Sequence, residues 1–208
     1  MGNHFLEIAG TPSVSAAQAA NGSSALIARA LAGDRHADRL TSAEAQFIAG
    51  RDSFYLATVS ETGWPYIQHR GGPPGFLHVL DDKTLAFADF RGNRQYISLG
   101  NAAVTGRAAL FLMDYARRRR LKIYAHIAVK ELRDDPALTA AVTLSGYRGK
   151  PERIFVLEVE AFDWNCPQHI TARFSEAELA PLFARLQELE TENAALREKA
   201  AHVTGDVS

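Results

Sequence analysis

Residues 54–68, FYLATVSETGWPYIQ, contain two short segments rich in aromatic and aliphatic residues on either side of a polar turn. Segments of this composition are typical of β-strands, and the glycine-containing turn at residues 61–63 predicts a hairpin that returns the second strand beside the first. A second hairpin is expected over residues 76–90, around the turn at residues 81–83. The chain therefore begins an antiparallel meander at residue 54.

Three later segments extend this meander. Residues 107–115 and 120–131 predict two longer strands, and residues 153–162 alternate apolar and polar side chains as a final strand. Between the two hairpins, QHRGGPPGF at residues 68–76 is predicted to be a loop, because prolines remove ladder donors and glycines admit unusual backbone angles. About seven short strands with close turns favour a closed or partly closed antiparallel barrel over a parallel sheet.

Few helices are expected beside these strands, so the predicted class is mainly β with α, or α+β. Thr41 and Glu44 have the spacing of a capping box, which predicts a helix start just before the first strand. Helices inside the barrel region are predicted at residues 41–50, 94–99 and 136–144.

The chain divides by composition into three parts. Residues 1–40 are rich in Ala, Ser and Gly and predict an N-terminal arm, with one short helix over residues 24–31 that ends at Gly33. Residues 41–170 hold the strand series and form the predicted barrel domain. Residues 175–203 predict a C-terminal helix that is amphipathic or forms a coiled coil.

The C-terminal helix carries a short heptad pattern. Its seam residues are Leu182, Leu186, Leu189, Asn193 and Leu196. An asparagine at an a position is typical of paired helices, and the flanking charges suit a parallel pair. Two interpretations remain open: the helix pairs with that of a second copy, or it packs on its own barrel. Pro181 is predicted to mark its start.

Composition excludes several classes of protein. The 208 residues are 47% hydrophobic and 23% charged with a formal charge of -1, so no excess of basic residues favours nucleic acid. Cys166 is the single cysteine and cannot form an internal disulfide. No apolar run approaches the roughly 20 residues of a membrane span, and the N-terminus lacks a signal-peptide pattern. We expect a cytoplasmic protein without a membrane partner.

An anion site is expected at residues 91–95, RGNRQ, between a predicted strand and a predicted helix. Asn93 could cap the helix, the first-turn N–H groups would face the same point, and Arg94 adds a planar cation suited to phosphate. The alternative is that Asn93 is only a cap and Arg94 is solvated. The histidines and Cys166 lack metal-ligand spacing, so no metal site is predicted.

A basic run at residues 117–120, RRRR, leads into the strand at 120–131. Because side chains alternate along a strand, Arg119 and Arg120 should lie on opposite faces, where one could meet an anionic or carbonyl-bearing ligand. The alternative is an exposed hairpin rim.

Taken in order, residues 41–170 resemble the pyridoxamine 5′-phosphate oxidase-related FMN-binding family. The motifs that carry the resemblance are FYLATVSETGWPY, LAFADF, RGNRQYISLGN and RRRRLKIYAHIAV, and the RGGPPGF loop and NCPQHI resemble a flavin-nucleotide-binding branch of that family. The resemblance implies an antiparallel split β-barrel that forms a homodimer and binds FMN at the subunit interface.

The resemblance also implies residues that contact FMN. The family's Ser-Arg-Lys sequence, which holds the phosphate, corresponds to Asn93, Arg94 and Gln95, so the arginine is retained and the lysine is not. The strand-end pair that touches the flavin corresponds to Ala88 and Asp89.

Two further assignments come from the same resemblance. The family's phosphate-binding arginine corresponds to Gln68 or Arg70, of which Arg70 is favoured for its charge, and the neighbouring Gly71 belongs to the same candidate wall of the site. The family's glutamine before a later strand corresponds to Arg120, which places a cation near the flavin carbonyl edge.

The expected function is an FMN-dependent oxidoreductase acting on an unidentified small molecule, with Cys166 and His169 as candidates on the substrate side. The family's tryptophan and arginine that recognise pyridoxal phosphate have no counterpart here, which argues against vitamin B6 oxidation. The electron partner stays open among nicotinamide nucleotides, a deazaflavin and oxygen. Two alternatives are a non-enzymatic flavin or haem carrier, and an interaction protein that works through its paired C-terminal helix.

Overall fold

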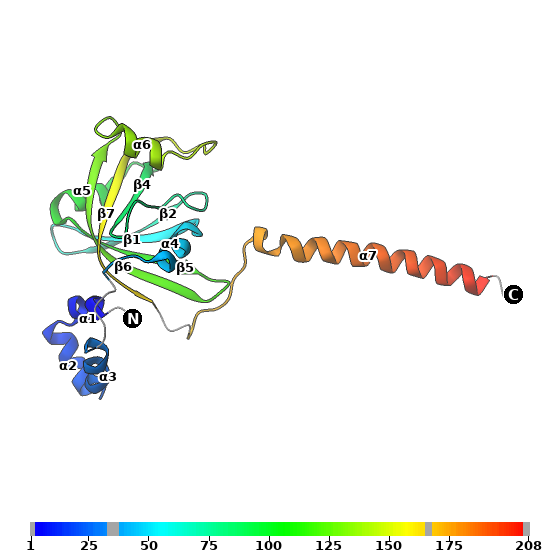
Figure 1. Ribbon diagram of the computed structural model, residues 1–208, viewed down its shortest axis with the longest axis horizontal. Coiled ribbons are helices and arrows are strands. Elements are labelled where there is room, and N and C mark those ends of the chain that lie inside the picture. The colour runs from blue at the N-terminus through cyan, green and yellow to red at the C-terminus, as the bar shows by residue number, and fades with distance from the viewer. Residues whose placement is uncertain (1–2, 33–37, 165–167, 206–208) are drawn as a thin grey trace. The chain divides into compact units, whose positions relative to one another are not determined.

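The computed structural model describes residues 3–32, 38–164 and 168–205 of the chain (Figure 1). Within these residues, seven strands form one antiparallel sheet in the order β2-β1-β5-β6-β7-β4-β3. The strands are β1 (Ser53–Val59), β2 (Pro65–Gly71), β3 (His78–Val79), β4 (Thr84–Phe90), β5 (Arg107–Asp114), β6 (Arg119–Glu131) and β7 (Pro151–Trp164). The predicted mainly β meander with added helices is confirmed.

The chain forms two compact units. The first unit, residues 1–114 and 118–170, contains the sheet and the first six helices. The second contains the C-terminal helix together with residues 115–117. The helices are α1 (Asn3–Ala9), α2 (Pro12–Ala20), α3 (Ser24–Leu31), α4 (Ser42–Ala49), α5 (Ile97–Thr105), α6 (Pro136–Val142) and α7 (Glu176–Gly205). In the described part of the chain, no helix is both long and apolar enough to cross a bilayer.

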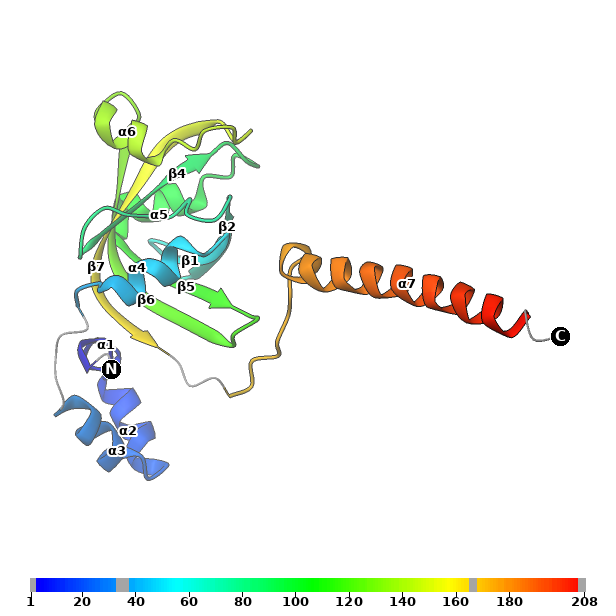
Figure 2. The same cartoon turned by 45° about the vertical axis from the view of Figure 1, so that its right-hand side comes forward.

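The N-terminal region is more helical than the sequence indicates. The predicted helix over residues 24–31 is present as α3, while its predicted end at Gly33 lies outside the described residues. Two further helices, α1 and α2, precede it, and α1 packs against β7 in both views (Figures 1 and 2).

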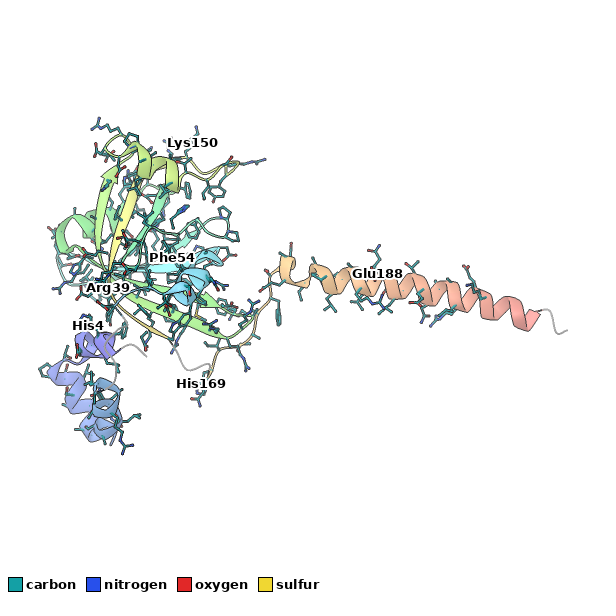
Figure 3. All side chains as sticks on the ribbon, viewed as in Figure 1. His4, Arg39, Phe54, Lys150, His169 and Glu188 are labelled. Atoms are coloured by element: carbon teal, nitrogen blue, oxygen red, sulfur yellow. The ribbon has the colours of Figure 1, made fainter. Side chains whose placement is uncertain are left out.

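The sheet curls around the larger of two apolar core clusters. Side chains alternate along β1 and β5 between buried and more exposed positions, so every second residue points inward. Phe54 lies inside the barrel (Figure 3), 5.3 Å from the ring of Phe87 in an edge-to-face contact. The barrel is split, because β2 and β4 face each other without forming a ladder.

Helix α4 closes one end of this core. Its predicted capping box is confirmed: the hydroxyl of Thr41 accepts from the N–H of Ala43, and the N–H of Thr41 donates to Glu44 Oε2 at 2.9 Å. Glu44 is buried, and its Oε1 accepts from Trp164 Nε1 at 2.7 Å. The capping residue therefore also fixes the end of β7.

The predicted loop at residues 68–76 begins later than expected. β2 continues to Gly71, which pairs with Ser53 of β1, so residues 68–71 are strand and only the rest is loop. The loop turns Phe76 back into the core, where it stacks 5.5 Å from Phe54. Gly72 lies under the Phe76 ring, and a Cβ at that position would stand 2.7 Å from Phe76 Cγ. The glycine is therefore required by close packing.

Two predicted helix boundaries are wrong. The helix predicted at residues 94–99 is α5, which starts at Ile97 after a left-handed Tyr96 and ends at a left-handed Gly106. The left-handed backbone before Ile97 belongs to the preceding turn, which delays the helix. Pro181 does not start α7, because the side chains of Ser175 and Glu178 form a capping box at Glu176, five residues earlier.

Candidate functional site

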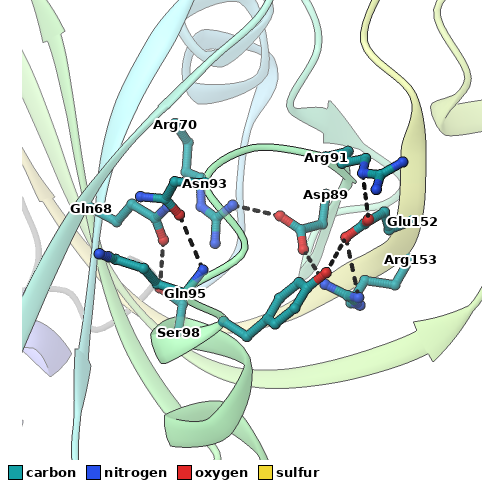
Figure 4. A network of polar contacts seen from close by, with 10 residues as sticks. Gln68, Arg70, Asp89, Arg91, Asn93, Gln95, Ser98, Glu152 and Arg153 are labelled. Atoms are coloured by element: carbon teal, nitrogen blue, oxygen red, sulfur yellow. Dashed lines mark hydrogen bonds and ion pairs between the residues drawn. The ribbon is translucent and has the colours of Figure 1, made fainter.

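An ion pair bridges the split between β2 and β4 (Figure 4). Arg70 of β2 donates from Nη1 to Asp89 Oδ1 of β4 at 2.5 Å, and Asp89 Oδ2 accepts from Arg153 Nη1 of β7 at 2.7 Å. Asp89 is only 8% exposed. A carboxylate this deeply buried needs such partners, because an unpaired buried charge is very costly.

One hydrogen-bond donor of the Arg70 guanidinium, Nε, is left without a partner by the described residues. The guanidinium lies over the rings of Phe87 and Phe155, with centroid distances of 5.7 and 5.3 Å. Its Nε is buried and has no hydrogen-bond partner among the described residues. Leaving a buried donor unsatisfied costs about 1–3 kcal/mol, and more for a charged group. The atom therefore marks a position where a ligand acceptor would be favourable.

A small polar pocket surrounds this ion pair. It has a volume of about 40 Å³. Since one water needs about 10–15 Å³, the pocket has room for roughly three waters or one phosphate-sized group. The residues that supply its polar atoms are Gln68, Arg70, Asp89, Asn93, Arg94, Tyr96, Ser98 and Glu152.

The turn at residues 91–96 forms one wall of the pocket. Arg94 and Tyr96 both have left-handed backbones, with φ of 62° and 54°, a conformation that costs a non-glycine residue of the order of 1–3 kcal/mol. Asn93 Oδ1 accepts from the N–H of Gln95 at 3.2 Å within this turn. No side chain caps the start of α5, so the helix presents its positive end without a capping group.

Two contacts fasten the turn to the sheet. Ser98 donates from Oγ to Gln68 Oε1 at 2.9 Å, which ties α5 to β2. The hydroxyl of Tyr96 donates to Glu152 Oε2 at 3.2 Å, which ties the turn to β7. The strained backbone of the turn is therefore held from both sides of the split (Figure 4).

Hydrogen bonds around the pocket raise the pKa values of two of its arginines. Burial acts to lower the pKa of Arg153, but its hydrogen bond to Asp89 raises that pKa overall. The pKa of Arg94 is also raised, chiefly by a hydrogen bond with Tyr96. Both guanidinium groups are thus charged across the whole physiological pH range.

The structure brings most of the predicted cofactor-binding residues together. Gln68 and Arg70 are two residues apart on β2, so their side chains lie on the same face of the strand. Both line the pocket, although only one of them was expected to reach the phosphate. Asp89, Asn93 and Arg94 line it as well. Gly71 follows Arg70 at the exposed end of β2, outside the pocket lining.

One predicted role is wrong, and two predicted cofactor-binding residues lie outside the pocket. Asn93 does not cap α5, because the helix begins four residues later and Asn93 bonds within the turn. Ala88 is buried in a second core cluster with Val142 and Ile154, on the face of β4 turned away from the pocket. Gln95 is exposed and does not line the pocket.

The basic run at residues 117–120 lies elsewhere. Arg119 and Arg120 point to opposite faces, as predicted: the Arg119 guanidinium lies 4.4 Å from the Trp164 ring, and that of Arg120 lies 5.6 Å from the Phe111 ring. Neither lines the polar pocket. His169 is exposed with a left-handed φ of 62°, and Cys166 lies outside the described residues.

Sequence reasoning missed Arg153 and Glu152, the contribution of β7 to the site. One signal was available for Arg153. It precedes Phe155 and Leu157 at two-residue spacing, so it stands in phase with buried apolar side chains of the same strand. A charge on an inward face requires a partner, and Asp89 is its ladder partner on β4.

In the parts of the chain that the structure describes, no group of three or more His, Cys, Asp or Glu side chains could hold a metal ion.

Comparisons with known proteins identify relatives. Residues 40–164 match the family model for pyridoxamine 5′-phosphate oxidase. No curated protein matches the chain. Among solved structures, the HupZ protein of Group A Streptococcus has 18% sequence identity and a TM-score of 0.50, and the alignment covers 65% of this chain and 99% of that chain.

Two other solved structures are similar at lower TM-scores. A putative pyridoxamine 5′-phosphate oxidase from Lactobacillus delbrueckii has 21% identity and a TM-score of 0.47, with 62% of this chain and 96% of that chain covered. An FMN-binding protein from Syntrophomonas wolfei has 16% identity and a TM-score of 0.44, with 58% and 81% covered.

Proposed function

The chain belongs to the pyridoxamine 5′-phosphate oxidase family, and on that premise we propose that it binds FMN with the phosphate in the polar pocket between β2, β4 and α5. The observation that carries the proposal is the buried Arg70 Nε, a cationic donor in that pocket without a partner among the described residues. A phosphate monoester is an acceptor of matching charge and size.

The residues of the pocket fit a phosphate group. Arg70 would donate from Nε while Asp89 keeps its Nη1 in place, and Arg94 would add a second cation from the turn. The uncapped start of α5 adds the partial positive charge of a helix N-terminus. Asp89 and Glu152 are also at the pocket, but each is already paired with an arginine, so they orient cations more than they repel an anion.

The proposed activity is that of an oxidoreductase acting on an unidentified small molecule. When bound, FMN would supply the electron-transfer chemistry, and the chain would supply binding and orientation. Arg70 and Arg94 would hold the phosphate, Gln68 and Ser98 would fix α5 against β2, and Arg153 would keep Asp89 in position. The pocket is too small for the flavin ring, which would extend outside it.

A homodimer belongs to this proposal, and an apolar outer face supports it. On β1 and β2 the outward side chains include Tyr55 and Ile67, the latter 65% exposed, and Trp64 beside them is 77% exposed. Phe111 of β5 pairs with Tyr55 and extends the same face. Exposed apolar side chains grouped on one face are typical of an interface, and the family resemblance implies a second copy as its occupant.

The C-terminal helix supports the notion of a second contact between copies. Its heptad leucines are between 43% and 58% exposed. They are Leu182, Leu186, Leu189 and Leu196. Pairing of two such helices would bury these side chains. Cytoplasmic location is likewise a proposal, resting on the single cysteine.

Absorbance and flavin titration test the proposal. The purified chain, stripped of any bound flavin, is expected to take up FMN with a stoichiometry of one per subunit and to lose affinity when Arg70 is changed to Ala. Arg133→Ala, at a highly exposed arginine that does not line the pocket, is the matched control. Failure of the intact chain to bind FMN would remove the proposal.

Reduction assays then separate an enzyme from a carrier. The FMN-loaded protein is mixed anaerobically with NADH, NADPH or a reduced deazaflavin, and bleaching of the flavin absorbance is followed. Reduction by one donor supports the oxidoreductase. An FMN-loaded protein that none of them reduces would instead favour a non-enzymatic carrier.

A further inference from the structure

A second cavity lies on the outer face of the sheet, under α1. Its volume is about 400 Å³, within the range of roughly 300–1,000 Å³ that is usual for small-molecule sites. The residues that form it come from α1, from the end of β1, from the starts of β2 and β5, and from β6 and β7. It shares no lining residue with the polar pocket.

Helix α1 is fastened over the sheet at two points. The ring of Phe5 stacks on Tyr124 of β6 with centroids 4.2 Å apart, and His4 Nε2 bonds Glu160 Oε1 of β7 at 3.1 Å. Ile8, one turn beyond Phe5, lines the cavity and is still 41% exposed. The helix thus roofs a space that its own side chains do not fill.

The cavity exists because its floor is made by two small side chains, those of an alanine pair on neighbouring strands. Ala57 of β1 pairs with Ala109 of β5, whereas the next outward pair along the same strands is the bulky Tyr55 with Phe111. Val59 and Pro65 add apolar walls. Apolar surface that faces an open space of this size is best covered by an apolar group.

The charges at the cavity leave one cation in excess. Glu160 accepts from His4, and it lies 3.4 Å from His126 Nε2, so its charge is matched within the protein. Arg107 also lines the cavity, and its side chain has no hydrogen bond or ion pair to any residue that the structure describes. A planar cation at the edge of an apolar cavity is suited to a carboxylate.

We propose that the cavity under α1 binds a small amphiphilic carboxylate, with its apolar part between Ile8 and the Ala57–Ala109 floor and its carboxylate at Arg107. The site is separate from the FMN pocket, so a molecule bound here would act as a regulator or cargo. Ala57 of the floor pairs with Ile67, so the cavity borders the face proposed for a second copy. Neither the binding site nor its ligand class depends on whether FMN binds.

The test compares octanoate with 1-octanol and octylamine on the full chain, by calorimetry or by displacement of the fluorescent probe anilinonaphthalene sulfonate. Octanoate is expected to bind saturably and at least tenfold more tightly than octylamine. Arg107→Ala should weaken octanoate by about tenfold and leave 1-octanol unchanged, as the loss of one charge-assisted hydrogen bond requires. Arg29→Ala, at an arginine of α3 that is not part of the cavity, is the matched control.

Filling the cavity gives an independent readout. Ala109→Phe from the floor and Ile8→Trp from the roof should each reduce octanoate affinity by at least tenfold while FMN affinity is unchanged. Circular dichroism and sedimentation check that each variant is folded and has the parent's assembly state. If one variant fails this check, the other still tests the site. Retention of octanoate binding in the folded filled variants would overturn the site, and equal binding of octylamine and octanoate would overturn its preference for a carboxylate.

Discussion

Arg70 Nη1 and Asp89 Oδ1 lie 2.5 Å apart and connect β2 to β4, two strands that share no backbone ladder. Both side chains are almost buried, and Asp89 has a second arginine, Arg153, on its other oxygen. The pair therefore holds the two sides of the split together at the point where the polar pocket opens.

Asp89→Asn is expected to lower the free energy of unfolding by about 3 kcal/mol, because removing one partner of a buried ion pair leaves the other charges uncompensated. Urea denaturation followed by circular dichroism measures the change. Asp134→Asn is the matched control, since its carboxylate is exposed and its change should stay within about 0.5 kcal/mol. An unchanged midpoint for Asp89→Asn would show that the ion pair does not stabilise the split.

Arg94→Ala is expected to weaken FMN binding by about tenfold and riboflavin binding hardly at all, because riboflavin lacks the phosphate that the Arg94 guanidinium would meet. Fluorescence quenching of each flavin gives the two affinities. Arg29→Ala is the control, since Arg29 lies in α3 and does not line the pocket. Equal weakening of FMN and riboflavin would mean that the phosphate lies elsewhere.

The strands could be predicted from the sequence because each has its own local signal. In β7 the alternation predicted within residues 153–162 reappears from Phe155 to Ala161 as alternating burial. The capping box of Thr41 and Glu44 is equally local and fixes the start of α4. Periodicity and short-range spacing are therefore enough to predict the barrel.

The site was less predictable, because two of its features are not local. The left-handed backbones of Arg94 and Tyr96 contradict the usual preference of these residue types, so no propensity would place the start of α5 at Ile97. Arg153 reaches the pocket only through the register that pairs it with Asp89. That register is set by the whole sheet.

Ile67→Asp is expected to convert a barrel-based homodimer into monomers, because it places a charge in the middle of the apolar outer face. Leu189→Asp should leave that dimer intact while it separates any C-terminal helix pair. Sedimentation velocity on both variants distinguishes the two contacts, with Ile67→Val as the conservative control. Monomers from Leu189→Asp and dimers from Ile67→Asp would reverse the assignment and make α7 the assembly element.

The contact between His4 and Glu160 should make the docking of α1 depend on pH. Hydrogen bonds that His4 donates to Glu7 and Glu160 raise the pKa of His4, so its stabilising effect is complete below the unfolded value near 6.5 and is lost as the pH rises through the folded value. The hydrogen bond from His4 lowers the pKa of Glu160, so that contribution is lost as the pH falls through its folded value, below about 4.5. The stabilising window therefore lies between these limits.

Hydrogen exchange of the α1 amides, corrected for intrinsic rates, measures this window. Protection is expected to be greatest at pH 5–6.5 and to decrease by about 0.2–1 kcal/mol toward pH 8.5, the range of a partly exposed ion pair. His126 also faces Glu160, so His126→Gln is tested alongside His4→Gln. Protection that is unchanged by pH in the parent chain would contradict the role of His4.

Gly72→Ala is expected to destabilise the barrel by about 1–3 kcal/mol, because the added methyl group would stand 2.7 Å from Cγ of the buried Phe76 and force its ring away from Phe54. Gly100→Ala is the matched control inside α5, where a new Cβ meets no atom within 4 Å, and it should raise stability by about 0.5–1 kcal/mol. If Gly72 is needed for close packing, urea denaturation will show a lower free energy of unfolding for Gly72→Ala and a higher one for Gly100→Ala. An unchanged free energy of unfolding for Gly72→Ala would mean instead that the Phe76 ring can shift without cost, and that the backbone of the RGGPPGF segment can adjust beside the pocket.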